Sequence, residues 1–295
     1  MSFTFGFDLP SNPSTTSNTV AQLGASPSSH TTWGHATSTP RVIHLDELTT
    51  APAFCSISVL TCTYDDPKGH FRVVKNVEGV IADLPEGSDL VPGVYEGGLK
   101  IWESSKDLVC YLQNQRIIRP LYRVLELGCG HGLPGIHALQ QGADSVVFSD
   151  LNEEVLREVT RPNIFLNVAN RALSSARISL ICGDWEALPQ ILGVDKPVDF
   201  NVIISAETFY TPAVTNKLLR CIHRYLAKTP EALALVAGKR YYFGTGGSVA
   251  NLMSQASALG MRSRVVASSE DGRSNIRDIV EIRCKMEGLV RGEKI

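Results

Sequence analysis

A short run of alternating glycines constrains the fold of this 295-residue chain more than any other feature of its sequence. The strand-like residues 122–127 lead directly into Gly128-Cys129-Gly130-His131-Gly132. Glycines at alternate positions between a strand and a helix let a ligand lie against backbone that has no Cβ atoms. The turn alone therefore predicts a nucleotide-like ligand, and enzymes that use NAD or FAD contain such a turn too.

The sequence from Tyr122 onward alternates strand-like and helical segments, which is typical of a parallel sheet covered by helices. The predicted strands are residues 122–127, 145–149, 177–182, 199–205 and 231–237. The predicted helices lie near residues 133–141, 152–159, 163–171, 213–227 and 247–259, and the second has Asn152 as its N-cap. Two last strands, 262–268 and 276–284, are expected to form an antiparallel pair. The prediction is an α/β, Rossmann-like fold.

Two acidic residues beside the glycine turn narrow the ligand class. Glu126 lies immediately before the turn, where a carboxylate would repel a pyrophosphate but complement the α-ammonium group of a methionine moiety. Asp150 ends the next predicted strand, where its carboxylate can accept hydrogen bonds from ribose hydroxyls. Together they predict S-adenosylmethionine as the cofactor. A tight turn with incidental acids, or an NAD-linked oxidoreductase, is the alternative.

The ends of the next two strands carry further candidate site residues. Asp184 and Trp185 suit an adenine base, since the carboxylate can accept from the exocyclic amine and the indole gives apolar contact. A core Trp at a strand-end turn is an equal alternative for Trp185. Glu207 and Tyr210 follow Ser205, at the edge of the sheet where a substrate would enter. A helix cap is the alternative for Glu207.

Composition excludes several classes of protein. The 28 basic and 30 acidic residues give no global charge that would indicate nucleic acid or a membrane surface as a partner. The seven cysteines are never paired as C-x-x-C, so we expect reduced thiols and neither a zinc ribbon nor a disulfide framework. The seven histidines form no convincing metal set, and each is read as a satisfied or solvated side chain. With no signal peptide or membrane-spanning run predicted, the expected location is the cytoplasm and nucleus.

The sequence before the first predicted strand divides into two parts. Residues 1–45 are rich in Ser and Thr and are predicted to be a disordered tail. Residues 46–98 are predicted to be an N-terminal extension, with a hairpin within 52–76 and a loop that covers the cofactor. The predicted catalytic domain spans residues 99–290.

Several of these segments closely resemble the histidine protein methyltransferase family, a relative of the lysine protein methyltransferases. The resemblance spans roughly residues 80–285 and is carried by five segments. They are Asp89-Leu-Val-Pro-Gly-Val-Tyr-Glu-Gly-Gly-Leu-Lys-Ile-Trp-Glu103, Glu126-Leu-Gly-Cys-Gly130, Glu158-Val-Thr-Arg-Pro-Asn163, Glu207-Thr-Phe-Tyr210 and Tyr242-Phe-Gly-Thr-Gly-Gly247. The chain departs from the family pattern at Asn201, where Asp is expected, and at Ala206, where Ser is common.

The resemblance implies a seven-stranded class I methyltransferase that methylates a histidine of a large-subunit ribosomal protein, and we expect a monomer. It implies that residues 101–105 help to close over the cofactor and that the acid-x-x-Tyr segment faces the substrate. The predicted catalytic residues are Glu207 and Tyr210. The predicted cofactor-binding residues are Ile101, Trp102, Glu103, Ser104, Ser105, Glu126, Gly128, Gly130, Asp150, Leu151, Asp184, Trp185 and Ser205.

A chemical role for Glu207 follows from the properties of imidazole. A histidine side chain is mostly neutral at pH 7 and already nucleophilic, so the question is which ring nitrogen reacts. We hypothesise that Glu207 accepts a hydrogen bond from one ring N–H, which turns the lone pair of the other nitrogen toward the methyl group. A lysine methyltransferase on the same scaffold and a ribosome-assembly factor that binds the cofactor without turnover remain alternatives.

Overall fold

The structure of this protein is a computed structural model. It describes residues 40–43, 57–61, 70–74, 81, 89–91, 94–169, 177–193, 198–270, 272 and 276–285. Apart from residues 40–43, the predicted N-terminal tail lies outside the described residues.

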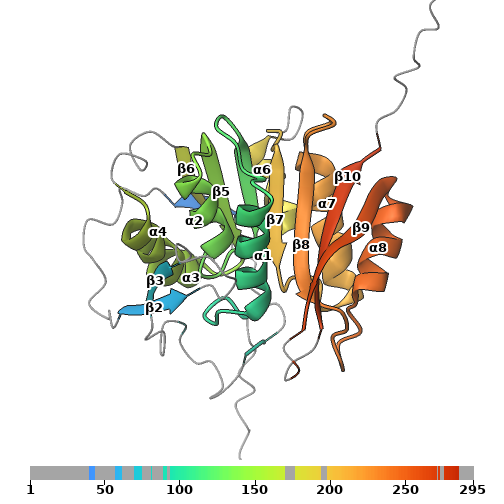
Figure 1. The fold of residues 1–295 in the computed structure, drawn as a ribbon, viewed down its shortest axis with the longest axis horizontal. Helices are drawn as coiled ribbons and strands as arrows, with labels where there is room; N and C mark the ends of the chain where they lie inside the picture. The colour runs from blue at the N-terminus through green and yellow to red at the C-terminus, as the bar shows by residue number, and fades with distance from the viewer. Residues whose placement is uncertain are drawn as a thin grey trace, which may run out of the picture. The chain divides into compact units, whose positions relative to one another are not determined.

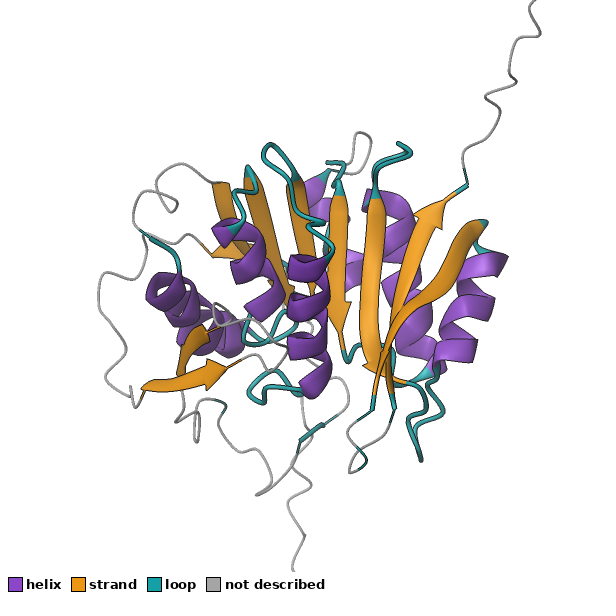
Figure 2. Cartoon of the chain, viewed as in Figure 1, coloured by secondary structure: helices purple, strands orange, loops and turns teal. Residues whose placement is uncertain are grey.

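An eight-stranded sheet forms the centre of the fold (Figures 1 and 2). Its strand order is β1 (Arg41–Ile43), β6 (Arg177–Cys182), β5 (Ser145–Asp150), β4 (Arg123–Leu127), β7 (Val202–Ala206), β8 (Leu233–Lys239), β10 (Arg277–Cys284) and β9 (Met261–Ser269). The five strands from β6 to β8 are parallel, whereas β10 is antiparallel to both β8 and β9. The predicted α/β class and the antiparallel C-terminal strand are confirmed. The additional strand, β1, pairs antiparallel with β6.

Helices cover both faces of the sheet because side chains along each central strand alternate between the two faces. On β4, Val124 packs into the cluster that includes the apolar residues of α1 (Glu103–Asn114), α2 (Leu133–Gln140) and α4 (Arg161–Asn167). Leu125 and Leu127 pack into the opposite cluster, with the apolar residues of α7 (Pro212–Tyr225) and α8 (Val249–Ala258). Helix α6 (Pro189–Leu192) lies on this second face as well. No helix in the described ranges is both long and apolar enough to span a membrane.

The sequence predicts two separate helices between β5 and β6, but the structure has one continuous helical segment there. The α-helix α3 (Glu153–Val155) continues into a π-helical turn, η2 (Leu156–Thr160), and then into α4. Pro162 lies inside this continuous segment, just after the π-helical turn, and has no N–H to donate to a helical hydrogen bond. The π-helical turn directs the Thr160 hydroxyl to the Gly130 carbonyl oxygen, 2.6 Å away, so the deviation from α-helix supports the glycine turn.

A small hairpin, β2 (Ile57–Thr61) and β3 (His70–Val74), lies within the segment where the sequence indicates one. Its strand β3 lies beside α4, since Asn167 of α4 accepts from the Arg72 N–H (2.7 Å) and donates to the Arg72 carbonyl oxygen (2.6 Å). The side chain of Asn167 therefore pairs with β3 as a neighbouring strand would.

Candidate active site

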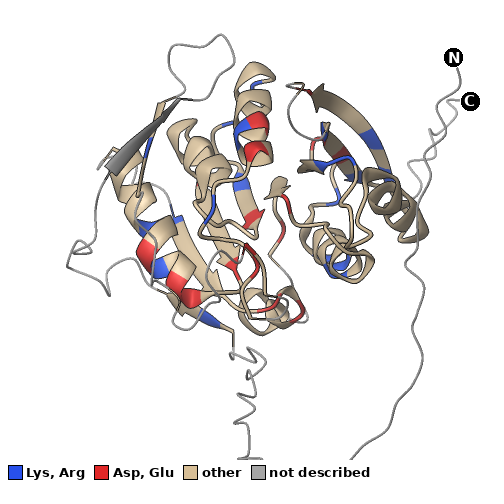
Figure 3. Ribbon diagram, turned by 90° about the horizontal axis from the view of Figure 1, so that it is seen from below, with Lys and Arg blue, Asp and Glu red and all other residues tan. Residues whose placement is uncertain are grey.

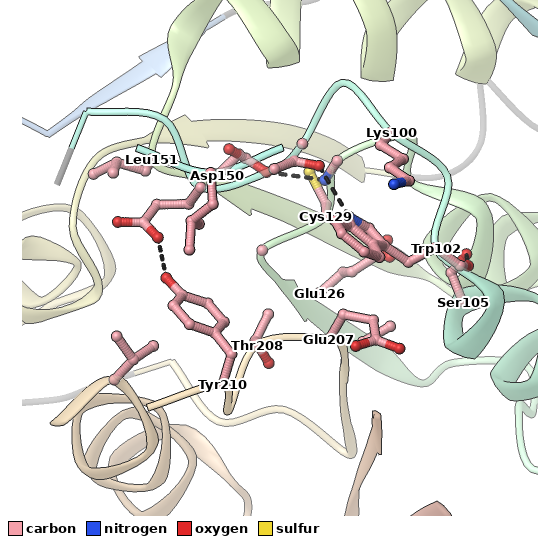
Figure 4. Close-up of a pocket in the computed structure, with 18 of the residues that line it drawn as sticks. Lys100, Trp102, Ser105, Glu126, Cys129, Asp150, Leu151, Glu207, Thr208 and Tyr210 are labelled. Atoms are coloured by element: carbon pink, nitrogen blue, oxygen red, sulfur yellow. Dashed lines mark hydrogen bonds between the residues drawn. The ribbon is translucent and has the colours of Figure 1, made fainter. Parts of the chain in front are cut away.

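A cavity of about 620 Å³ lies at the carboxyl ends of the parallel strands. It is lined by the turns that follow β4, β5, β6 and β7 and by residues 96–102, which we call the cover segment. Asp150, Cys129 and Trp102 lie on one side of the cavity, and Thr208, Tyr210 and Glu207 on the other (Figure 4). The strand ends that the sequence marks as candidate sites thus meet at one place.

The glycine turn requires its glycines for two physical reasons. Gly128 and Gly130 have φ angles of 64° and 48°, in the left-handed region that side chains disfavour. A Cβ on Gly128 would lie 2.6 Å from the Thr208 methyl carbon, and one on Gly130 would lie 3.1 Å from the Gly98 carbonyl oxygen. The turn therefore brings the cover segment and the end of β7 closer than any other residue type would allow.

Glu126 lies at the floor of the cavity and is 3% exposed. Its Oε2 accepts a hydrogen bond from the Gly135 N–H at 2.9 Å, in the first turn of α2. Burial raises the pKa of the Glu126 carboxyl well above its ordinary value, although the Gly135 N–H acts against the shift. A cationic ligand group placed here would stabilise the ionised form.

Asp150 ends β5 and is held by backbone donors on both oxygens. Oδ2 accepts from the Gly130 N–H at 2.9 Å, and Oδ1 accepts from the Asn152 N–H at 3.2 Å. Burial raises the pKa of the Asp150 carboxyl to about 6, against the lowering effect of these N–H groups. Each carboxylate oxygen keeps a second lone pair that can accept from a ligand hydroxyl.

Asp184 and Trp185 both line the cavity at the end of β6, but the Asp184 carboxylate already has protein partners. Its Oδ2 pairs with Lys217 Nζ at 2.7 Å, and its Oδ1 accepts from the Glu186 N–H at 2.9 Å. A bond from an adenine amine to Asp184 would have to share these oxygens with Lys217, a partner that the sequence did not indicate.

The cover segment is attached to the sheet by three side chains from three different strand ends. Asn152 Nδ2 donates to the Val94 carbonyl oxygen, just before the segment, at 2.7 Å. His131 Nε2 lies 3.0 Å from the Leu99 carbonyl oxygen, and the Tyr210 hydroxyl donates to Glu96. Asn152 is the N-cap of α3 as predicted, but its side chain makes no capping bond and holds the cover segment instead.

Trp102 closes the far end of the cover segment. Its indole Nε1 donates to the Gly97 carbonyl oxygen at 3.0 Å, which folds the segment back on itself. Two ammonium groups lie over its ring, Lys100 Nζ at 4.5 Å and Lys239 Nζ at 5.3 Å from the ring centroid. The ring is therefore a wall of the cavity and not part of the core.

Glu207 occupies a strained position at the end of β7. Its φ of 58° is uncommon for a residue with a Cβ, and such strain is concentrated at functional sites. Its Oε1 accepts from the buried Ser104 hydroxyl, and its Oε2 accepts from the Tyr242 hydroxyl at 2.6 Å. Burial raises the pKa of the Glu207 carboxyl, while these two hydroxyls and the charge of Lys239 act to lower it.

A second cavity of about 260 Å³ adjoins the first. Trp102, Glu207 and Tyr210 line both cavities. Lys239 and Tyr242 line the second cavity but not the first. Two exposed aromatic side chains, Tyr241 and Phe243, stand at its rim. A ligand group in the second cavity would approach one in the first beside Glu207.

Most of the predicted site residues line the larger cavity. Ile101, Ser105 and Leu151 do so together with the residues described above. Three do not: Glu103 is exposed at the start of α1, Ser104 lies behind Glu207, and Ser205 donates to the Leu127 carbonyl oxygen at 2.7 Å. Ser104 and Ser205 thus hold other groups of the protein. Glu96, Asn152, Thr208 and Tyr242 belong to the site without being predicted from the sequence, and so does His131, for which no role was predicted.

The charged side chains that line the larger cavity suit S-adenosylmethionine. Five carboxyl groups line it, those of Glu96, Glu126, Asp150, Asp184 and Glu207, against two lysines, Lys100 and Lys217. Figure 3 looks onto this edge of the sheet, where acidic positions gather among the central loops. Such a lining repels phosphate but accepts the cationic sulfonium and ammonium groups of the cofactor. Within the described ranges, no group of His, Cys, Asp and Glu residues could hold a metal ion.

Comparisons with known proteins agree with this chemistry. A family model described as lysine methyltransferase matches residues 93–243. A histidine protein methyltransferase 1 homolog from Dictyostelium discoideum is 39% identical over 69% of this chain and 63% of its own length. Its counterpart from Rattus norvegicus is 36% identical over 55% of this chain and 50% of its own length, so this chain spans only half to two thirds of these relatives.

Among solved structures, the chain is similar to that of magnesium protoporphyrin IX methyltransferase from Synechocystis PCC 6803 with bound SAM. It matches with a TM-score of 0.45 and 14% identity, over 61% of this chain and 78% of that one.

Proposed function

Because this chain belongs to the lysine methyltransferase family and is similar to its histidine protein methyltransferase members, we propose that it methylates a histidine side chain of a protein. The methyl donor is S-adenosylmethionine, which supplies an electrophilic methyl group on its sulfonium when bound. The acceptor ring enters through the smaller cavity and meets the donor where the two cavities join. Glu207 lies at that junction, and its placement is the observation on which this proposal depends.

Glu207 acts as the acceptor of a ring N–H. The Ser104 and Tyr242 hydroxyls both donate to it, an arrangement that fits an ionised carboxylate and leaves further lone pairs directed at the cavity. When Glu207 accepts from one imidazole nitrogen, the lone pair of the other points away from it, toward the larger cavity. The carboxylate then stabilises the imidazolium that methyl transfer produces.

Alignment and exclusion of water are the remaining tasks of the protein. The cover segment, held by Asn152, His131 and Tyr210, closes one side of the larger cavity. Trp102 lines both cavities and separates the incoming ring from bulk water. Held in this way, the acceptor nitrogen and the methyl carbon need little further ordering to reach an in-line geometry.

A lysine acceptor is the second candidate, because the matching family model is described as lysine methyltransferase. An amine must lose a proton before it can attack, at a cost set by its ordinary pKa of about 10.4, whereas an imidazole is already neutral at pH 7. Lys239 also lines the smaller cavity, and its ammonium group would repel the ammonium group of a substrate lysine there. These two considerations favour histidine.

The protein substrate is proposed to be a component of the large ribosomal subunit, as the resemblance of residues 80–285 implies. The corresponding location is the cytoplasm and nucleus, where such proteins are made and assembled. A cofactor-binding assembly factor without turnover is the alternative that a measured reaction would exclude.

Product analysis tests the proposal directly. The purified chain is incubated with labelled S-adenosylmethionine and ribosomal proteins from cells that lack the enzyme, followed by acid hydrolysis and amino-acid analysis. We expect label in methylhistidine. Label in methyllysine would replace the histidine proposal with the lysine one, and cofactor binding without label would support the assembly factor.

A further inference from the structure

His131, in the middle of the glycine turn, has both ring nitrogens engaged by the protein. It is 6% exposed and lines the larger cavity. Nε2 lies 3.0 Å from the Leu99 carbonyl oxygen, which can only accept, so Nε2 carries the proton. Nδ1 lies 3.1 Å from the Asn163 amide nitrogen, which can only donate, so Nδ1 is bare. The ring is neutral, and neither nitrogen is left for a ligand.

The orientation of the Asn163 amide is fixed independently of the histidine ring. Asn163 is fully buried, and its Oδ1 accepts from the Val74 N–H of β3 at 2.9 Å. Its Nδ2 donates a second bond to the His131 carbonyl oxygen at 3.1 Å. A flipped amide would lose both bonds, so Asn163 presents a donor to Nδ1 and enforces the Nε2–H tautomer.

These contacts connect three parts of the chain that are distant in sequence. Strand β3 orients Asn163 of α4, Asn163 sets the tautomer of His131, and His131 holds the cover segment at Leu99. Burial lowers the pKa of the His131 imidazole to about 4, so the ring keeps this form in neutral solution.

We propose that His131 is a positioning residue that sets cofactor affinity by fastening the cover segment to the glycine turn, with Asn163 as the group that holds its tautomer. This inference rests on the proposed function in one respect, that the ligand of the larger cavity is S-adenosylmethionine. A closed cover segment orders the wall of that cavity before the cofactor arrives, and loss of the bond to Leu99 makes each binding event order the segment anew.

His137 provides a matched control. It lies six residues further along the chain, within α2, is 3% exposed and also has its pKa lowered to about 4 by burial. It does not line the cavity, and its Nε2 has no hydrogen-bond partner among the residues that the structure describes. Truncating either histidine removes a buried imidazole, but only His131 contacts the cover segment.

The experiment is calorimetric titration of S-adenosylhomocysteine into the full chain carrying His131→Ala, His131→Gln, Asn163→Leu or His137→Ala. We expect Kd to rise about 10-fold or more in His131→Ala, the typical consequence of losing a buried hydrogen bond. His131→Gln should stay within about threefold, because its amide N–H can reach Leu99, and His137→Ala should bind as the wild type does. Hydrogen exchange of residues 94–102 should accelerate in His131→Ala but not in His137→Ala.

A second readout concerns the tautomer. Ring ¹⁵N spectra of labelled histidine should show His131 as the Nε2–H form in the wild type and a mixture of tautomers in Asn163→Leu, with Kd raised several-fold. A wild-type Kd in both His131→Ala and Asn163→Leu would overturn this inference alone. Equal losses in His131→Ala and His137→Ala would overturn it too, as a general packing effect. Absence of binding by the wild-type chain would contradict the proposed function as well.

Discussion

Glu126 and Asp150, in the cofactor half of the site, accept hydrogen bonds from backbone N–H groups, whereas Glu207, in the acceptor half, accepts them from two side-chain hydroxyls. The backbone donors arise wherever a strand, a glycine turn and a helix follow one another. The hydroxyls come from residues far away in the sequence, since Ser104 is 103 positions and Tyr242 is 35 positions from Glu207.

Backbone donors of this kind belong to the fold in general, whereas the side-chain hydroxyls that donate to Glu207 are particular to the chemistry of this chain. A backbone N–H does not depend on the identity of a side chain, so the donors to Glu126 and Asp150 come with the strand–turn–helix geometry itself. The acceptor half depends on particular hydroxyl groups, so single substitutions there change the reaction without changing the fold. Substitutions of single residues in one half or the other test this division.

The largest effect is expected from removing the Glu207 carboxylate. Glu207→Gln and Glu207→Ala should both lower the single-turnover rate at saturating cofactor by about 100-fold or more. Gln removes the counter-charge of the imidazolium, and Ala removes the acceptor of the ring N–H as well. The measurement is rapid-quench methyl transfer to a histidine peptide, with the Kd of S-adenosylhomocysteine as the control. We expect that Kd to stay within about twofold; a normal rate in both variants would remove Glu207 from the mechanism.

The same division explains how much of the molecule the sequence predicted. Strand and helix positions, the antiparallel end of the sheet and the convergence of Glu126, Asp150, Asp184 and Glu207 on one cavity all follow from local patterns and from the rule that parallel strands end at one edge. The link from Glu126 to the Gly135 N–H spans only 9 residues, within reach of a local motif.

Long-range side-chain contacts could not be predicted from the sequence. Nothing in the sequence pairs Tyr242 with Glu207, Lys217 with Asp184, or His131 with Leu99, because each pair meets only after the whole sheet has formed. Tyr242 lies in the loop that follows β8, and its hydroxyl donates to Glu207. Helices near 152–159 and 163–171 were wrong as separate elements because a π-helical turn joins them.

The next largest effect concerns the free energy of unfolding and comes from Asp150, in the cofactor half. The folded pKa of Asp150 is about 6 against an ordinary value of 3.8, so between these values the folded protein binds a proton that the unfolded chain has lost. The contribution of Asp150 to the free energy of unfolding should therefore fall by up to about 3 kcal/mol as pH rises through this window. Above pH 6 it should be constant.

Urea unfolding of the wild type and Asp150→Asn between pH 4 and 7 measures this contribution as the difference between the two free energies. We expect the wild type to lose stability relative to Asp150→Asn as pH rises, and S-adenosylhomocysteine to reduce the slope, since ribose hydroxyls that donate to the carboxylate favour its ionised form. A difference that does not change with pH would mean that the Asp150 carboxyl titrates as it does in water.

A smaller effect is expected when one hydroxyl donor of the acceptor half is removed. Tyr242→Phe deletes the donor to Glu207 Oε2 and leaves the one from Ser104. Loss of a bond to the charged form should raise the pKa of Glu207, so the acidic limb of the profile of kcat against pH should move to higher pH and the rate at pH 7 fall about 10-fold. Tyr241→Phe, at the exposed rim, is the control, and an unmoved acidic limb in Tyr242→Phe would show that the hydroxyl does not tune Glu207.

The smallest effect distinguishes two roles for Tyr210, which the sequence predicts to be catalytic. Its hydroxyl donates to Glu96 of the cover segment, and burial raises the pKa of the phenol, so it is a poor proton carrier at neutral pH. If this bond serves mainly to hold the cover segment, Tyr210→Phe should raise the KM for the cofactor by about three- to tenfold, while the single-turnover rate at saturating cofactor stays within about twofold. The reverse pattern, a reduced rate with an unchanged KM, would return Tyr210 to the reacting groups beside Glu207. Glu96→Gln separates the two further, because it keeps an acceptor for the Tyr210 hydroxyl and should alter the KM less than Tyr210→Phe does.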